Sequence, residues 1–261
     1  MIEMPASFCY TAYISFKKME KLTKIRDMIE MTDNKKIDIL GIRVDNYTVR
    51  ESLLRLDSYL GSTVLNIIET VTMEQLVSSD EFPEIRDCLK QADLCIVGEY
   101  EILLAANGAT EQRIREVRNQ DFLHELLKRI VRSQKRVFLV AMTNMQIQQM
   151  KESFLELVSE FVSVGDFAVE ECAEDMDTIV NEINGATPDI VISALASPVE
   201  ESFILSHKDK IGTSVWYGIR DSYCQGQGKI QVGKTLKKIV LKGRLQHVVS
   251  KYEQNKSKDR K

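Results

Sequence analysis

The sequence predicts an α/β fold, in which a Rossmann-like, mostly parallel sheet with flanking helices is followed by a basic C-terminal helical appendage. Short apolar runs alternate along the chain with segments of helical period, and this alternation is typical of strands joined by helical crossovers. The chain has 261 residues, of which 44% are hydrophobic, 28% are charged and only four are prolines. This composition favours one large α/β domain with a sizeable core and argues against low-complexity disorder.

Five short apolar runs are predicted to form the main strands of the sheet. They cover residues 64–69, 93–97, 137–141, 189–194 and 214–218, with an opening strand and turn expected after Lys36 and a weaker strand at 161–165. Helices are predicted between them, at residues 49–60, 100–107, 120–133, 144–161 and 175–185, with two shorter ones separated at Pro83. Thr48 is the predicted N-cap of the first helix, because its hydroxyl can accept from a free backbone amide.

The segment INGATPDIVISALASPVEESFI, residues 183–204, carries the clearest local signals. Its Asn-Gly pair ends a helix, and Pro188 lets the chain re-enter as a strand. The apolar run then ends in small residues up to Ser197, and Pro198 suits the first turn of the next helix. Ligands bind at such carboxyl ends of strands in open α/β sheets, although an ordinary strand-to-helix turn has the same pattern.

Polar or small residues follow each of the five predicted strands. They are Thr70 and Thr72, Gly98 and Glu99, Thr143 and Asn144, then Ser197, Pro198, Glu200 and Glu201, and finally Arg220. If the strands are parallel, these residues gather at one edge, where hydroxyls, carboxylates and helix N-termini suit a sugar and its phosphates. Each residue alone is more commonly a cap or a solvated surface group, so it is the coincidence at five strand ends that indicates a site.

Motifs and composition exclude several classes of protein. The chain has no GxGxxG, P-loop, HExxH or GxSxG motif, so a dinucleotide site is unsupported. Five scattered cysteines without CxxC spacing and three histidines favour reduced cytosolic thiols, with no disulfide framework and no metal site. The sequence lacks a signal-peptide pattern and any run of about 18 apolar residues, so no segment is predicted to span a membrane.

The charge of the chain is distributed unevenly. Residues 230–261 carry a net charge of +8, whereas the remainder carries −12. The tail sequence IQVGKTLKKIVLKGRLQHVVSKY predicts an amphipathic helix that docks on an anionic membrane surface. Two alternatives stay open, namely that its apolar face packs on the body of the protein or that the tail is a solvated, frayed end. A nucleic-acid partner is not expected, because no motif supports one.

Three regions are therefore expected. Residues 1–35 are predicted to be a poorly ordered N-terminal extension, for which Met31 is an alternative start. Residues 36–228 form the Rossmann-like domain, and residues 229–261 form the basic amphipathic tail.

Several of these segments resemble the WecG/TagA/CpsF family of bacterial glycosyltransferases, over residues 36–220. The strand and loop of INGATPDIVISALASPVEESFI resemble the family's "PkQE" segment, and ADLCIVGEYEILLAA resembles "adlvlpDGigvvlaa". ETVTMEQL is similar to a strand ending in T-x-N, with Thr70 on the threonine and Thr72 in place of the asparagine. VRNQDFLHELL is similar to the "v.GsDl" helix start, with Asp121 on the aspartate, and VSVGDF retains Gly165 of "ivGa.hGyf".

The resemblance implies a Rossmann-like fold and the transfer of an N-acetylmannosamine-like sugar from UDP to a polyprenyl-diphosphate-linked sugar, in cell-surface polysaccharide synthesis. It implies a protein in the cytoplasm, peripheral at the inner face of the cell membrane. We expect an inverting reaction without a cofactor, and without a DxD-like pair no bound metal is implied. The alternative function is a non-catalytic nucleotide-sugar-binding or scaffold protein on the same fold.

The chain departs from the family pattern at two important positions. The family's proposed catalytic aspartate falls on Gly98, so the neighbouring Glu99 becomes the candidate general base. The glutamine of "PkQE" falls on Glu200. Arg220 or basic residues of the tail are the candidates to cover the leaving diphosphate. The expected substrate-binding residues are Thr70, Thr72, Gly98, Asp121, Asn144, Gly165, Ser197, Pro198, Glu200, Glu201 and Arg220.

Overall fold

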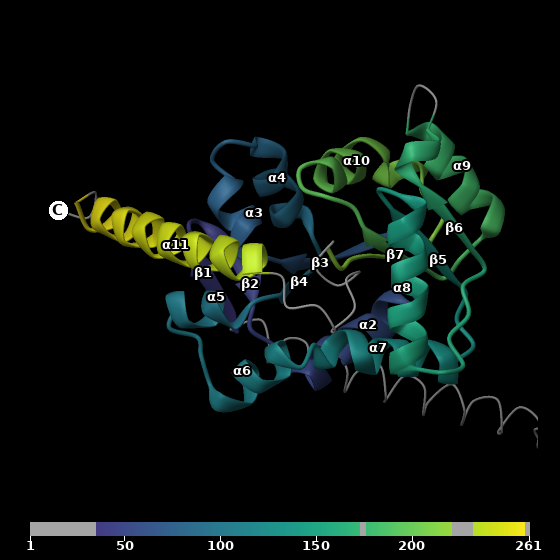
Figure 1. Cartoon of the computed structure of the whole chain (residues 1–261), viewed down its shortest axis with the longest axis horizontal. Coiled ribbons are helices and arrows are strands. Elements are labelled where there is room, and N and C mark those ends of the chain that lie inside the picture. The colour runs from purple at the N-terminus through teal and green to yellow at the C-terminus, as the bar shows by residue number, and fades with distance from the viewer. Residues whose placement is uncertain (1–34, 173–175, 221–231, 259–261) are drawn as a thin grey trace, which may run out of the picture. The chain divides into compact units, whose positions relative to one another are not determined.

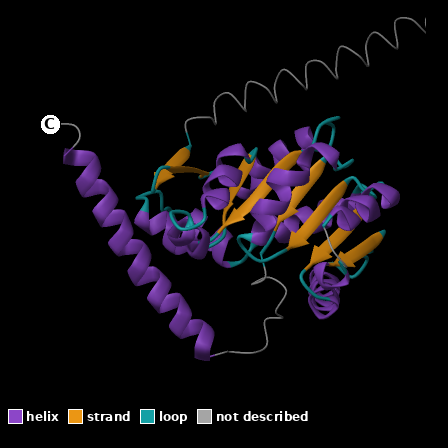
Figure 2. Ribbon diagram, turned by 90° about the horizontal axis from the view of Figure 1, so that it is seen from above, coloured by secondary structure: helices purple, strands orange, loops and turns teal. Residues whose placement is uncertain are grey.

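The computed structural model describes residues 35–172, 176–220 and 232–258. The predicted N-terminal extension before Lys35 and the predicted boundary near residue 228 lie outside the described residues, so both stay predictions. Within the described residues, one sheet is covered by helices on both faces (Figures 1 and 2). This confirms the predicted α/β class.

The sheet has eight strands in the order β1-β2-β4-β3-β8-β7-β5-β6. Only β1 and β2 pair antiparallel, through a tight turn at Leu40 and Gly41, and all other neighbours are parallel. The five predicted main strands are confirmed. The weaker strand expected at 161–165 lies at 165–168 instead, because GDFA pairs with β5 although it carries little apolar signal. The strands are β1 (Lys36–Ile39), β2 (Ile42–Asp45), β3 (Asn66–Val71), β4 (Leu94–Val97), β5 (Val137–Ala141), β6 (Gly165–Ala168), β7 (Ile190–Ala194) and β8 (Val215–Gly218).

Several helices begin where the sequence places a hydroxyl cap or a proline. Thr48, Thr72 and Thr143 each accept from a backbone amide of the first turn, and in each case the third helical residue bonds back to the threonine amide. The helices are α2 (Val49–Tyr59), α3 (Met73–Ser78), α4 (Pro83–Gln91), α5 (Tyr100–Ala105), α6 (Glu111–Arg118), α7 (Asp121–Arg132), α8 (Asn144–Leu157), α9 (Asp177–Ala186), α10 (Val199–His207) and α11 (Val232–Lys258).

Alternating residues of the strands pack against two different layers of helices. On one face, which we call the α7 face, Ile68, Ile192 and Tyr217 pack with α2, α7 and α8. On the opposite face, the α10 face, Ile67 and Trp216 pack with α4, α9 and α10. The two-residue period of a strand therefore decides which layer each strand-end residue meets.

The parallel strands bring their carboxyl ends to the same edge of the sheet. In the register of the sheet, Val71 of β3 is paired with Val97 of β4, and Gly218 of β8 is paired with Glu69 of β3 and Ser193 of β7. We call this the carboxyl edge. It is the edge at which the sequence predicts the site.

The predicted tail helix is present as α11, and part of its apolar face packs on the body. Leu245 is 1% exposed within a core cluster that also contains residues of β2, β4, α3 and α5. Lys238 Nζ lies 3.3 Å from Glu101 Oε1 of α5. Ile239 and Val240, by contrast, are 62% and 60% exposed. The alternative in which this helix packs as core therefore holds for Leu245, while Ile239 and Val240 remain uncovered within the described structure.

Candidate functional site

Residues at the carboxyl edge separate into two groups on opposite faces of the sheet. Thr70 points to the α7 face, where its Oγ1 donates to Tyr217 Oη at 3.2 Å. Its neighbour Glu69 points to the α10 face, where it meets Arg220. The edge therefore carries a pocket on one face and a buried ionic cluster on the other.

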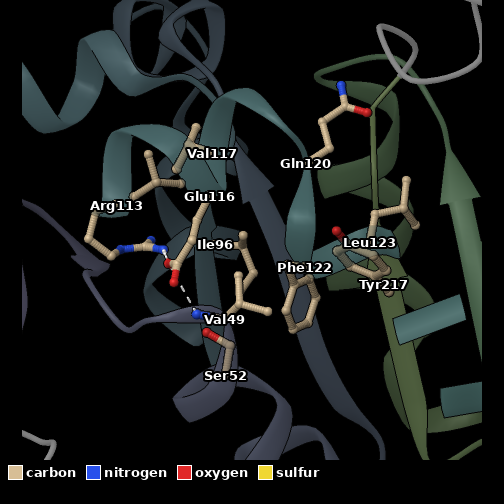
Figure 3. Close-up of a pocket in the computed structure, with 11 residues that line it drawn as sticks. Val49, Ser52, Ile96, Arg113, Glu116, Val117, Gln120, Phe122, Leu123 and Tyr217 are labelled. Carbon is tan, nitrogen blue, oxygen red and sulfur yellow. Dashed lines mark hydrogen bonds and ion pairs between the residues drawn. The ribbon is translucent and has the colours of Figure 1, made fainter. Parts of the chain in front are cut away.

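The pocket lies at the carboxyl ends of β4 and β8, between the first turn of α2, helix α6 and the start of α7 (Figure 3). Its cavity volume is about 20 Å³, about the space of one water molecule, so a larger ligand requires its walls to move apart. Aromatic and aliphatic side chains dominate its lining, and such surfaces suit the flat face of a base or a sugar ring. The lining residues are Val49, Ser52, Ile96, Val97, Arg113, Glu116, Val117, Gln120, Phe122, Leu123 and Tyr217.

The charged residues of the pocket neutralise one another. Arg113 Nη1 donates to Glu116 Oε2 at 2.6 Å, and its Nε donates to Asn46 Oδ1 at 3.1 Å. Glu116 Oε2 also accepts from the amide of Val49 at 3.2 Å, which satisfies the first amide of α2 (Figure 3). This wall of the pocket therefore presents a shaped surface and hydrogen-bonding groups to a ligand. It presents no unpaired positive charge.

Three predicted site residues border the pocket. Thr70 is bonded to the lining residue Tyr217, Gly98 follows Val97, and Asp121 follows Gln120. A Cβ atom on Gly98 would lie 2.8 Å from both Thr70 Cγ2 and the Val71 carbonyl oxygen. A glycine is therefore required here, because β3 and the turn after β4 approach too closely for any side chain.

The ionic cluster on the α10 face consists of Glu69, Glu200, Glu201 and Arg220. All three glutamates are 0% exposed and the arginine is 5% exposed. Arg220 Nη1 donates to Glu200 Oε2 at 2.8 Å, and its Nη2 lies 3.2 Å from Glu201 Oε1 and also donates to Glu69 Oε2. Its Nε reaches the carbonyl oxygen of Thr70 at 3.4 Å. The guanidinium thus joins the ends of β3 and β8 to the first turn of α10.

Neutral side chains donate further hydrogen bonds to the carboxylates of the cluster. Trp216 Nε1 donates to Glu200 Oε1 at 3.0 Å, Gln75 Nε2 donates to Glu201 Oε1 at 2.7 Å, and the Ser197 hydroxyl donates to the same carboxylate. Gly218 leaves room for these carboxylates, since a Cβ atom there would lie 2.7 Å from Glu200 Oε1.

Burial controls the protonation of the cluster. It raises the pKa of Glu69 well above the usual range, and it raises the pKa of Glu200 to about 7, although Arg220 opposes both shifts. Burial acts to lower the pKa of Arg220 itself, but the surrounding glutamates outweigh it and the pKa is raised. The arginine is therefore charged at any pH at which the protein is folded.

These contacts change the interpretation of four predicted residues. Ser197, Glu200, Glu201 and Arg220 lie together, as predicted, but they bond to one another instead of facing an open edge. Every nitrogen of the Arg220 guanidinium is engaged within the protein. Most of its N–H groups are used in this way and the side chain is buried, so its expected contact with the leaving diphosphate would require the cluster to open.

Glu99 lies at the carboxyl end of β4, in the N-cap position of α5 but without a side-chain bond to that helix. Its Oε2 accepts from the amide of Met73, the first residue of α3, at 2.6 Å. Burial raises the pKa of Glu99, while the Met73 amide and Lys238 act to lower it. Thr72 caps the same helix through Gln75, so the expected free N-terminus of α3 is already occupied.

Asn144, Gly165 and Pro198 lie away from the pocket. The exposed Asn144 begins α8, and its amide donates to Glu170 at 2.7 Å. Gly165 starts β6 and therefore lies at the amino edge of the sheet, where a Cβ atom would be 2.7 Å from the ring of Phe138. This close contact explains why a glycine is needed at position 165. Pro198 follows Ser197 through a cis peptide and precedes α10.

Sequence reasoning missed Glu69, Tyr217 and the Arg113–Glu116 pair. A charged residue within the apolar run VLNIIET was the available signal for Glu69, because a carboxylate in a strand covered on both faces requires a partner. The pocket walls from α2 and α6 gave no such signal, since only the tertiary fold brings them to β8.

Among the residues that the structure describes, no group of His, Cys, Asp and Glu side chains could hold a metal ion. In the same residues, every helix is too short or too polar to cross a membrane.

A parallel α/β sheet with a pocket at its carboxyl edge defines the general class of α/β ligand-binding proteins. Residues 37–229 match the Glycosyl transferase WecG/TagA/CpsF family, and the chain belongs to this family. The predicted resemblance is thereby confirmed. The chain is 20% identical over 197 residues to an N-acetylglucosaminyldiphosphoundecaprenol N-acetyl-beta-D-mannosaminyltransferase of Staphylococcus aureus (strain NCTC 8325 / PS 47), covering 74% of this chain and 76% of that protein. It is equally similar over 195 residues to the protein of the same name from strain MRSA252.

Proposed function

We propose that this glycosyltransferase moves an N-acetylmannosamine-like sugar from a UDP donor to a sugar linked to a polyprenyl diphosphate. The observation that carries the proposal is the pocket at the carboxyl edge, in a chain of this family. The names of the relatives support the lipid-diphosphate-linked acceptor and the mannosamine-type sugar.

The donor would place its rings at the pocket, whose walls would move apart to admit them, and its phosphates at the start of α7. Phe122 and Tyr217 provide apolar walls there. Gln120 precedes α7 without a side-chain bond to its amides, so the helix N-terminus is available to an anion. The carboxylate of Asp121 in this first turn would repel a phosphate, and we assign it to hydroxyl groups of the donor.

Glu99 is the proposed general base of an inverting, metal-independent transfer. Glu99 follows β4, at the same edge as Gly98 and Thr70, and burial raises the pKa of its carboxyl group. Ionised Glu99 would take the proton of the acceptor hydroxyl as that oxygen attacks the anomeric carbon of the donor, and UDP would leave from the opposite side.

Isothermal titration calorimetry with UDP and UDP-sugars is expected to detect binding that depends on the pocket. Val49→Trp should weaken it by about 10-fold or more, because the indole would occupy the space between α2 and α6. Val64→Trp is the matched control, since Val64 is 65% exposed in the connection before β3. Absence of heat with every donor at millimolar concentration, or equal affinity of the two variants, would contradict this site.

A non-catalytic nucleotide-sugar-binding protein is the second candidate function. Two observations favour it, namely Gly98 at the position of the family aspartate and the engagement of Glu99 by the Met73 amide. A UDP-release assay with a lipid-diphosphate-linked acceptor separates the two functions. Binding without release with any donor would favour the non-catalytic one.

The tail is proposed to hold the protein at the inner face of the cell membrane. Ile239 and Val240 are exposed beside Lys242, Arg244 and other cations of α11, and this combination suits an anionic lipid surface. Sedimentation with phosphatidylglycerol vesicles should exceed that with phosphatidylcholine vesicles. The paired change of Ile239 and Val240 to serine should reduce it several-fold while leaving the buried Leu245 contact intact. Equal sedimentation with both lipids, with or without residues 230–261, would exclude membrane docking.

A further inference from the structure

The charges of the buried cluster on the α10 face do not cancel. Three carboxylates meet one guanidinium, so full ionisation would leave an excess of negative charge away from water. An uncompensated charge in such a place is costly, and proteins avoid it by retaining a proton. Among the described residues, Arg220 is the single cation paired with these glutamates.

Two oxygens of the cluster lack a donor. Glu69 Oε1 and Glu201 Oε2 are buried, and neither has a hydrogen-bond partner among the described residues. A carboxylate oxygen in this situation is stabilised by a proton, because the carboxyl group then donates to a neighbouring acceptor. The geometry thus favours a carboxyl–carboxylate arrangement beside Arg220.

The surrounding groups cannot supply the missing charge. α3 contributes the neutral amide of Gln75, and β8 contributes the indole of Trp216. The thiol of Cys88 on α4 interacts with all three glutamates and that of Cys95 on β4 interacts with Glu69. Burial raises the pKa of both thiols, so they stay neutral.

We propose that these three glutamates and Arg220 form a pH-sensitive clamp that retains a proton in the folded protein and loosens when the proton is lost. This inference goes beyond sugar transfer and does not depend on it. The clamp joins β3, β8 and α10 at the carboxyl edge. Glu69 is adjacent to Thr70, which bonds to the pocket residue Tyr217, so loosening on the α10 face reaches the pocket on the α7 face.

The direction of the effect follows from linkage. The pKa values of Glu69 and Glu200 are raised in the folded state, to about 7 for Glu200. At pH values above the usual pKa range of carboxyl groups, the folded protein therefore binds more protons than the unfolded chain. The stability that this proton contributes is present at low pH and is lost as pH rises through the folded pKa values.

Thermal unfolding between about pH 6 and pH 9 tests the clamp. Glu69→Gln imitates the protonated carboxyl group, so near pH 6 this variant should melt close to the unmodified protein. Near pH 9 it should melt higher by roughly 3 °C or more. Glu81→Gln, which changes an exposed glutamate between α3 and α4, should follow the unmodified protein at every pH. A constant difference between Glu69→Gln and the unmodified protein would overturn the proposal.

Infrared spectroscopy gives a second measurement that requires no variant. The carbonyl stretch of a protonated carboxyl group should be present in the folded protein near neutral pH and should disappear as pH rises. If this band is absent from the folded protein at about pH 6, where exposed glutamates are already ionised, the cluster holds no proton and the proposal fails.

Discussion

Glu99→Gln is expected to lower turnover by roughly 100-fold or more while leaving UDP binding nearly unchanged. Glutamine keeps an oxygen that can accept from the Met73 amide, so the start of α3 should remain capped. It cannot accept the proton of the acceptor hydroxyl, so only the rate of the chemical step should fall. Steady-state release of UDP, together with calorimetry of the same protein, separates the two effects.

Glu111→Gln is the matched control, because Glu111 is an acid at the start of a helix, as Glu99 is, but is exposed. Burial raises the pKa of Glu99, so kcat/KM should fall as pH drops through a value above that of an exposed glutamate, since the base must be ionised. Near-normal turnover of Glu99→Gln would assign Glu99 to capping alone.

The order of the strands and of most helices could be predicted from the sequence because the signals are local, whereas α6 was not predicted. VLNIIET and RVFLVAM are apolar runs of strand length, and Thr48 and Pro83 mark helix starts. The position of β6 was predicted too early, because GDFA becomes a strand through its pairing with β5 and not through its own composition.

The candidate site could be predicted only in part, because residues adjacent in a strand face opposite layers. The sequence placed Thr70, Gly98 and Arg220 at one edge, and all three lie there. It did not indicate that Arg220 is enclosed by glutamates or that Tyr217 and Phe122 meet at right angles beside the pocket. Arg220 and Glu69 are 151 positions apart, and even Arg220 and Glu200 are separated by 20 positions, so no local pattern encodes these contacts.

Arg220→Met is expected to cause the largest loss of stability, about 3–5 kcal/mol, because it leaves three buried carboxylates without their cation. Methionine fills part of the same volume, so the effect should come from charge more than from a cavity. The loss should increase with pH, since protonation of Glu69 and Glu200 relieves it at low pH. Urea unfolding at several pH values measures both quantities.

Arg129→Met provides the comparison for this change. Arg129 pairs with Asp57 at the surface, with 33% of its side chain exposed, and such pairs contribute about 0–1 kcal/mol. Combining Arg220→Met with Glu69→Gln should recover part of the stability lost, because one of the unpaired carboxylates is then neutral. If Arg220→Met costs no more than Arg129→Met, the cluster does not hold the carboxyl edge together. If the double variant is simply additive, the loss comes from packing rather than from uncompensated charge.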